Sequence, residues 1–254
     1  MIMEYISSAK NDHIKAAKKL TVKKYQKQAG AYLLEGWHLV QEAINAGQQP
    51  RRIYATEKFL NERELKPFYD QTTEISPDVA KHLAETETPQ GIFAVLPLEE
   101  DKLSEPLSGQ YLLLDAIQDP GNVGTLVRTA DAAGVKTVVF GGGTADPFNP
   151  KVLRAMQGSQ FHVKIVSTPL PRLVENLKKA GIPVYGSELN DAAKPYREVA
   201  PSDQFALIVG NEGNGMSQDL LAATDQNLYI PIKGRAESLN VAIAAAVILF
   251  HLTA

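Results

Sequence analysis

The sequence predicts an α/β protein of two domains, the second built on a mostly parallel sheet. Short apolar segments alternate with helical patterns along the chain, and in the second half they stand far enough apart for crossover connections. The length of 254 residues fits one large domain or two modest ones. Hydrophobic residues make up 44% of the chain and charged residues 22%, which excludes disorder and collagen-like repetition.

The first domain is expected over residues 1–97 as a small α/β unit. Its expected helices are 8–28, 37–46, 57–65 and 77–84. Its expected strands are 31–34, 52–56, 73–76 and 92–96. Residues 98–109 mix acidic residues with Pro, Ser and Gly, which is typical of an exposed linker.

The second domain is expected over residues 110–254. Its expected strands are 111–114, 137–140, 163–166, 183–185, 205–209 and 228–231. The final segment, 239–252, has no Asp, Glu, Lys or Arg, which predicts a helix buried on all sides, in its own domain or against a partner. Ala242 and Ala244–Ala246 would permit close approach of another helix, so a dimer interface is a reasonable hypothesis.

Missing residue types exclude several functions. Without any Cys, thiolate nucleophiles, disulfides and Cys-ligated metal sites are impossible. The phosphate loop G-x-x-x-x-G-K-[ST], H-E-x-x-H and G-x-S-x-G are absent, and the five histidines are scattered, so no metal is expected. The longest apolar run, 241–250, is short of the roughly 20 residues of a membrane helix. We therefore expect a cytoplasmic protein without a membrane partner.

A lysine cluster near the start contrasts with the net charge of −3. Seven lysines lie between residues 10 and 27, where Asp12 is the single acid. Such a cluster can neutralise phosphates. The lysines predicted to bind RNA are Lys18, Lys19, Lys23 and Lys24. A solvated basic helix face explains the charge equally well.

The first candidate loop spans residues 115–131, after an expected strand. An Asp119-Pro120-Gly121 turn leads through Asn122 into a helix that carries Arg128. A helix N-terminus offers free backbone N–H groups to an anion such as a phosphate. Arg128, on the same helix, could reach that phosphate as well. Simple turn glycines and a surface cation are the alternative.

The second candidate loop, 210–215, reads G-N-E-G-N-G after an apolar strand. Its glycines allow close backbone approach to a ligand, although their spacing does not match the dinucleotide fingerprint G-x-G-x-x-G. A long flexible turn is the alternative. Glu212, an acid between glycines, could face a cation or fix the loop.

The third candidate loop, 230–241, leads from a strand end into the apolar helix. Ser238 is expected to cap that helix. Asn240 is expected two residues inside it, where a buried amide needs a partner from a loop, a ligand or another subunit.

Together these stretches resemble the motifs of the SpoU (TrmH-type) family of RNA ribose 2'-O-methyltransferases. The motifs are N-x-G-x-x-x-R at 122–128, G-N-E-G-x-G at 210–215, I-P at 230–231 and S-L-N-V at 238–241. The resemblance implies a C-terminal domain with a trefoil knot, an obligate homodimer, the cofactor S-adenosyl-L-methionine and a smaller N-terminal substrate-binding domain. It further implies cofactor contacts, largely through the backbone, at Gly210, Ile230 and Leu239.

The implied reaction is in-line transfer of the cofactor's methyl group to a ribose 2'-hydroxyl, in which positioning can supply much of the rate. The implied active-site residues are Asn122, Arg128, Glu212, Ser238 and Asn240. The family likeness suggests Arg128 as the base for the hydroxyl. Because arginine stays protonated in proteins, we instead expect Arg128 to clamp the phosphate beside the target ribose.

Large-subunit rRNA is the expected substrate, because a separate module with a basic helix suits a folded rRNA target. Transfer RNA is the nearest alternative, and DNA is not expected because it lacks the 2'-hydroxyl. Two further alternatives stay open: a noncatalytic RNA-binding or ribosome-assembly factor of the same fold, and a nicotinamide-dependent oxidoreductase, which lacks the fingerprint glycines.

Overall fold

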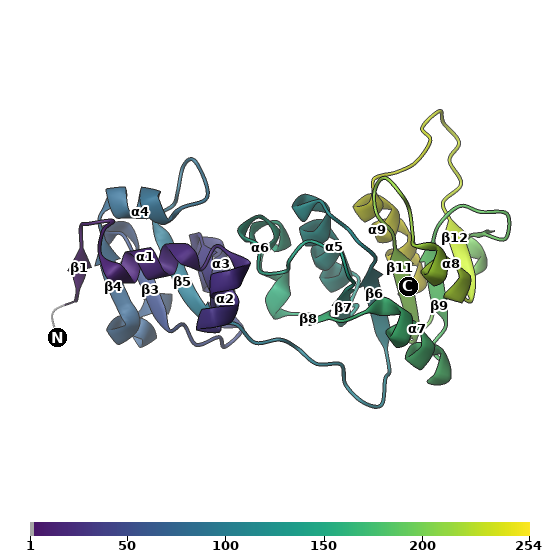
Figure 1. The fold of residues 1–254 in the computed structure, drawn as a ribbon, viewed down its shortest axis with the longest axis horizontal. Helices are drawn as coiled ribbons and strands as arrows, with labels where there is room; N and C mark the ends of the chain where they lie inside the picture. Colours follow the sequence, from purple (N-terminus) through teal and green to yellow (C-terminus); the bar gives the residue numbers. More distant parts are fainter. Residues whose placement is uncertain (1–2) are drawn as a thin grey trace. The chain divides into compact units, whose positions relative to one another are not determined.

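The computed structural model describes residues 3–254, which divide into two compact units (Figure 1). The first unit contains the described residues up to Glu99 together with Phe148–Phe161, and the second contains Glu100–Pro147 and His162–Ala254. The segment Phe148–Phe161, expected within the second domain, thus packs in the first unit. The division into independently folding domains at residues 97 and 110 stays a prediction.

A mixed five-stranded sheet with strand order β1-β4-β3-β5-β2 forms the first unit. Its strands are β1 Tyr5–Ile6, β2 Ala31–Glu35, β3 Arg52–Ala55, β4 Thr72–Ile75 and β5 Ile92–Pro97. Its α-helices are α1 Asp12–Lys19, α2 Lys23–Ala29, α3 Trp37–Asn45, α4 Pro77–Leu83 and α6 Pro150–Met156. Because strand side chains alternate, Tyr32 and Leu34 enter one apolar cluster while Ala31 and Leu33 enter another.

Two expected helices of this unit were wrong. The helix over 8–28 is divided at residues 20–22 into α1 and α2, and the buried Gln26 side chain donates to the carbonyl of Leu20 at the break (2.8 Å). The helix over 57–65 is two 3-10 helices, Glu57–Phe59 and Arg63–Gln71. Phe59 and Leu65 are both buried, and an α-helix would place residues six apart on different faces.

A seven-stranded sheet with order β10-β12-β9-β11-β6-β7-β8 forms the second unit. All its pairings are parallel, which confirms the sequence expectation. Its strands are β6 Gln110–Leu114, β7 Thr137–Phe140, β8 Lys164–Ser167, β9 Val184–Ser187, β10 Lys194–Pro195, β11 Phe205–Val209 and β12 Gln226–Tyr229. Its α-helices are α5 Pro120–Ala132, α7 Leu170–Lys179, α8 Gln218–Ala223 and α9 Val241–Leu252.

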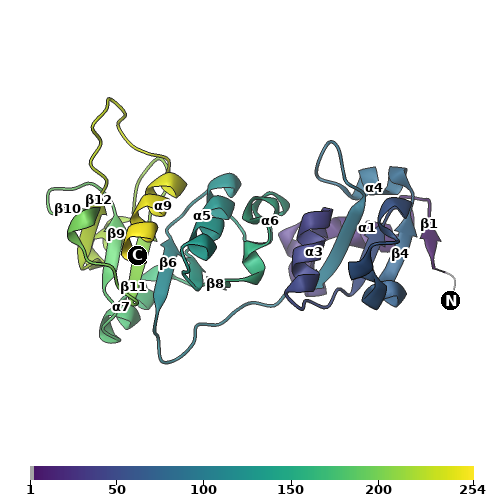
Figure 2. The ribbon, with the colours of Figure 1, turned by 180° about the vertical axis from the view of Figure 1, so that it is seen from behind.

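The helix α9 lies against α5, as both ribbon views show (Figure 2). One side of α9 is buried, but Ile243 and Phe250 are 55% and 53% exposed, so burial on all sides within this chain was wrong. No helix among residues 3–254 is both long and apolar enough to cross a membrane.

Candidate active site

The sheet register brings the ends of four strands of the second unit close to one level. Val209 of β11 pairs with Leu114 of β6 and with Ser187 of β9, and Ser187 pairs with Leu228 of β12. The loops that follow these strands therefore leave the sheet side by side. Ligands of parallel α/β sheets gather at such carboxyl ends.

The helix α5 begins as expected from the Asp119-Pro120-Gly121 turn. Asp119 caps it by accepting a hydrogen bond from the Asn122 N–H (2.8 Å), and Pro120 stands at its first turn. This cap fixes the backbone of Asn122. Arg128 lies further along the same helix and is exposed.

The glycine-rich loop after β11 is tightly hydrogen-bonded, which argues against the flexible-turn alternative. Asn211 and Gly215 exchange two backbone hydrogen bonds of 2.9 Å each. The Asn211 side chain accepts from the N–H groups of Gly213 (2.9 Å) and Asn214 (3.1 Å) and donates to the carbonyl of Ala116 (2.8 Å). The loop is thus fastened both within itself and to the segment after β6.

Gly210 is required by this tight packing. A Cβ at Gly210 would collide with the backbone of Gly215 and Met216. Sequence reasoning singled out Gly210 but missed Asn211, although an asparagine beside glycines is a known signal for a local side-chain turn.

A chain of hydrogen bonds joins three of the predicted catalytic side chains. Asn240 Nδ2 donates to Asn122 Oδ1, and Asn122 Nδ2 donates to Glu212 Oε1, both at 2.9 Å. Asn240 Oδ1 accepts from the N–H groups of Ala242 and Ile243. Residues 118 positions apart in the sequence are therefore directly bonded.

These bonds correct two expectations about the start of α9. Asn240, not Ser238, caps the helix, and Asn240 is exposed rather than buried inside it. The amide satisfies the helix N-terminus with its oxygen and Asn122 with its nitrogen, so it needs no burial. Ser238 lies two residues earlier, in the preceding loop.

A cavity of about 840 Å³ opens beside this hydrogen-bonded chain. Among its lining residues are all the predicted cofactor contacts and three of the predicted catalytic residues: Gly210, Ile230, Leu239, Glu212, Ser238 and Asn240. Apolar Leu228 and Val241 line it as well, whereas no lysine, arginine or histidine does among the described residues. Its size suits a small organic cofactor.

The residues present fit S-adenosylmethionine. Gly210 is a lining residue of the cavity, apolar side chains can cover a purine, and carboxylates suit a ligand with a positive charge. The described residues include no group of three or more His, Asp or Glu that could hold a metal ion.

Arg128 is not part of the hydrogen-bonded chain. Within residues 3–254 its guanidinium makes no hydrogen bond or ion pair, so five donors remain open to solvent or a ligand. The structure thus brings together Asn122, Glu212 and Asn240, and leaves Arg128 free.

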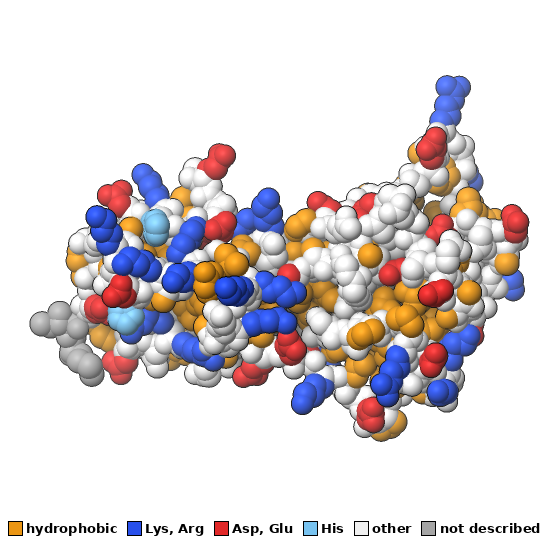
Figure 3. All heavy atoms as spheres, in the orientation of Figure 1, with side chains coloured by type: hydrophobic (Ala, Val, Ile, Leu, Met, Phe, Trp, Pro, Cys, Tyr) orange, Lys and Arg blue, Asp and Glu red, His pale blue; other side chains and the backbone are white. Residues whose placement is uncertain are grey.

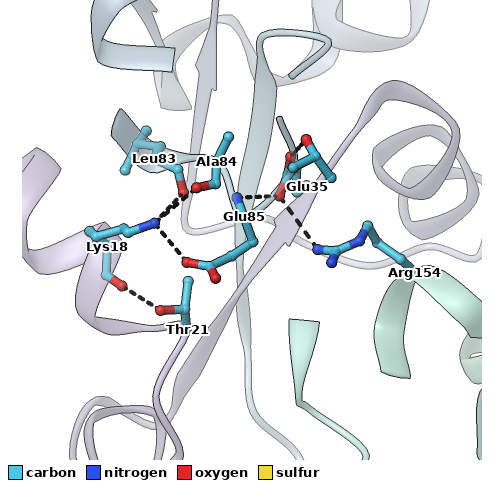
Figure 4. Close-up of polar contacts among 8 residues, drawn as sticks. Lys18, Thr21, Glu35, Leu83, Ala84, Glu85 and Arg154 are labelled. Carbon is cyan, nitrogen blue, oxygen red and sulfur yellow. Dashed lines mark hydrogen bonds and ion pairs between the residues drawn. The ribbon is translucent and has the colours of Figure 1, made fainter. Parts of the chain in front are cut away.

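Lys18 of the lysine cluster is fully hydrogen-bonded within the first unit. Lys18 Nζ donates to the carbonyls of Leu83 (3.3 Å) and Ala84 (2.9 Å) and to Glu85 Oε1 (2.6 Å) (Figure 4). All three donors of Lys18 are therefore used at the end of α4, against its predicted role in RNA binding. Figure 4 also shows Arg154 directed at Glu35, with a separation of 3.6 Å.

Other lysines of the cluster remain candidates for RNA contact. Cationic side chains gather over α1 and α2 (Figure 3). The ammonium groups of Lys19 and Lys24 lie 5.5 Å and 5.8 Å from the centre of the Tyr25 ring. An RNA role for Lys19, Lys23 and Lys24 stays a prediction.

Comparison with known proteins agrees with this geometry. The sequence model of the SpoU rRNA methylase family matches residues 109–250, and that of the MRM3-like substrate binding domain matches residues 11–94. The 23S rRNA (guanosine(2553)-2'-O)-methyltransferase RlmP of Bacillus subtilis (strain 168) is 48% identical, over 98% of this chain and 99% of the relative.

Two solved structures share the fold over nearly the whole chain. An AdoMet-bound rRNA methyltransferase from Sinorhizobium meliloti has a TM-score of 0.88 and 28% identity, over 98% of this chain and 97% of that one. The SpoU methyltransferase AviRb from Streptomyces viridochromogenes, in complex with AdoMet, has a TM-score of 0.83 and 26% identity, over 96% and 97%.

Fold and site together define a knotted α/β methyltransferase that uses S-adenosylmethionine, with a smaller N-terminal domain. The chain belongs to the SpoU rRNA methylase family. The expected class of enzyme, an RNA 2'-O-methyltransferase, and its cofactor are thereby confirmed. The roles of individual residues stay predictions.

Proposed function

We propose that this chain methylates the ribose 2'-hydroxyl of a guanosine in 23S rRNA. The Bacillus subtilis relative whose name gives that activity is similar to this chain over 98% of this chain and 99% of its own length. The similar part includes the substrate-binding region as well as the methyltransferase region. The observation that carries the proposal is the hydrogen-bonded chain from Asn240 through Asn122 to Glu212 at the edge of the cavity. Such a chain holds an acid in one orientation beside the cofactor site.

In the proposed reaction the ribose oxygen forms a bond to the methyl carbon, the carbon–sulfur bond breaks, and the hydroxyl proton leaves. The bound cofactor supplies the activated methyl group. Asn122 uses both ends of its amide within the chain of hydrogen bonds, so its part is to orient Glu212. Glu212 lines the cavity and has a second carboxylate oxygen that can accept the proton.

Arg128 supplies the RNA contact in this proposal. Its side chain is exposed, carries a permanent charge and has no partner among residues 3–254. A guanidinium of this kind binds phosphate through paired hydrogen bonds. Arg128 therefore clamps the backbone beside the target ribose rather than removing its proton.

A homodimer is the proposed state of the protein. The exposed Ile243 and Phe250 and the half-buried Val247 follow one another at helical spacing on the outer side of α9, and Leu239 is exposed just before the helix. Exposed apolar side chains in one stripe favour burial against a second copy. Light scattering of the wild type and of Ile243→Asp tests this. We expect the wild type to be a dimer and the variant to be a monomer. A monomeric wild type would contradict the proposal.

The proposed RNA substrate supports a cytoplasmic location, and neither DNA nor a membrane is proposed as a partner. The substrate is tested by transfer of labelled methyl from S-adenosylmethionine to total RNA from cells that lack this protein, followed by nucleoside analysis and mapping. We expect one 2'-O-methylguanosine in 23S rRNA. Labelling of tRNA alone, or methylation of a base instead of a ribose, would contradict the proposal. Ribosomal subunits are tested as a second form of the substrate beside the free RNA.

A further inference from the structure

Glu188 is an acid of the cavity that the family motifs do not include. It follows β9 directly, and the register places it beside Gly210, the residue after β11, and Tyr229, the last residue of β12. It lines the same cavity as the predicted cofactor contacts. Nothing in the local sequence marks it, because its position depends on where β9 lies in the sheet.

The carboxylate of Glu188 is held in place by the glycine-rich loop. Its Oε2 accepts a hydrogen bond from the Met216 N–H (3.2 Å), and its own N–H donates to the carbonyl of Leu228 (3.2 Å). A Cβ at Gly215 would stand 2.6 Å from Oε2, and Gly215 has φ of +68°. The glycine therefore leaves room for the carboxylate, and the loop and the acid fit each other.

The charges of the cavity distinguish Glu188 from the other two acids. Glu212 is bonded to Asn122, and Glu237 lies on an exposed loop, where water screens its charge. Glu188 is half-buried and fixed by backbone groups. No cation lines the cavity among the described residues, so the negative charge is not neutralised by the protein itself.

We propose that Glu188 is the fixed countercharge that recognises the cationic part of S-adenosylmethionine, its sulfonium and ammonium groups. Backbone contacts at glycines recognise the shape of a ligand, whereas a carboxylate held in a fixed position recognises its positive charge. Glu188 is thus a specificity-determining residue for the cofactor. The inference depends on the cofactor and not on the proposed rRNA substrate.

The test is cofactor binding without RNA, measured by calorimetry on the full-length Glu188→Gln variant. Glutamine keeps the length of the side chain and an oxygen that can accept the Met216 N–H, so the loop is preserved. The dissociation constant of S-adenosylmethionine is expected to rise about tenfold. That of 5'-methylthioadenosine, which has neither charge, is expected to change less than about twofold.

Asp203→Asn is the control, because it removes one negative charge from an exposed residue before β11, at the opposite end of that strand from the cavity, and should change neither constant. Salt gives a second measurement on the wild type: it should weaken S-adenosylmethionine binding and leave methylthioadenosine binding unchanged. Equal weakening of both ligands by Glu188→Gln, no weakening of either, or an equal effect of Asp203→Asn would overturn the proposal. Because no RNA is present, these results are independent of the proposed rRNA substrate.

Discussion

The two loops that line the cavity differ in how they are held. The loop 210–216 is fastened at almost every residue, by its own backbone bonds, by the Asn211 side chain and by Glu188. In the stretch 231–240 every residue is exposed, and Asn240 alone forms hydrogen bonds among the described residues. One side of the cavity is therefore preorganised, and the other is free to close on a ligand.

This difference is the opposite of what is expected if glycine simply makes a loop flexible. The fastened loop contains Gly210, Gly213 and Gly215, whereas the free stretch contains Gly234 alone. Glycine at 210 and 215 permits backbone or a carboxylate to come close, and that close packing makes the loop rigid.

The largest expected effect comes from Gly210→Ala. The new Cβ would strike the backbone of Gly215 and Met216, so we expect at least about 100-fold weaker S-adenosylmethionine binding in calorimetry. Gly234→Ala is the matched control in the free stretch, where no atom lies within 4 Å of the added carbon. Equal losses in both variants would show that the two loops do not differ as described.

Arg128→Ala, compared with Asn122→Ala, separates the free cation from the fastened amide. We expect Arg128→Ala to weaken RNA binding roughly 10-fold and Arg128→Lys to restore part of it, since lysine keeps the charge but not the paired geometry. Asn122→Ala should keep RNA and cofactor binding and lower turnover by about 100-fold, because Glu212 loses its orienting partner. Filter binding and single-turnover rates measure both. Tight RNA binding by Arg128→Ala together with complete loss of turnover would contradict the clamp.

Asn211→Ala should loosen the fastened loop. Its side chain makes three hydrogen bonds, so we expect about 1–3 kcal/mol lower free energy of unfolding in urea. Asn214→Ala removes the same group from a position that bonds only through its backbone, and should change stability by less than about 0.5 kcal/mol. An equally mild effect of both would mean that the loop is held by its backbone alone.

The smallest effects are expected from the lysines of the first unit. Replacing both Lys19 and Lys24 by Ala should weaken RNA binding a few-fold and flatten its salt dependence by about two phosphate contacts. Lys18→Ala should instead lower the melting temperature, with the salt dependence unchanged, because its donors are used at the end of α4. A salt slope that responds to Lys18 as strongly as to the other two would contradict this division.

Much of the second unit could be predicted from its sequence. Its central strands are short apolar runs bounded by polar turns, and the three candidate loops follow β6, β11 and β12 as expected. The turn at Asp119, which caps α5 through a local hydrogen bond, was predicted correctly as the start of a helix. The cap of α9 was predicted at Ser238, two residues before Asn240, which is the actual cap. Local sequence patterns therefore predicted the presence of strands and helices better than the residues at which they begin and end.

Contacts between distant residues could not be predicted in the same way. The partners of Lys18 lie 65 to 67 residues away, and Glu188 reaches the cavity only because β9 lies between β11 and β12. The segment Phe148–Phe161 joins the first unit through the Gln26 bond to Phe148 and the burial of Leu153. Charge and spacing in a sequence do not show which donors the fold will use.

We expect the loop 210–216 to be formed before the cofactor binds, and the stretch 231–240 to become ordered only when it binds. Amide hydrogen exchange, with and without saturating S-adenosylmethionine, tests it most directly. Peptides covering 210–216 should exchange slowly in both states, whereas peptides covering 232–239 should exchange fast and become protected when the cofactor binds. Fast exchange of both loops without cofactor, or a 232–239 stretch that stays unprotected with it, would contradict the claim.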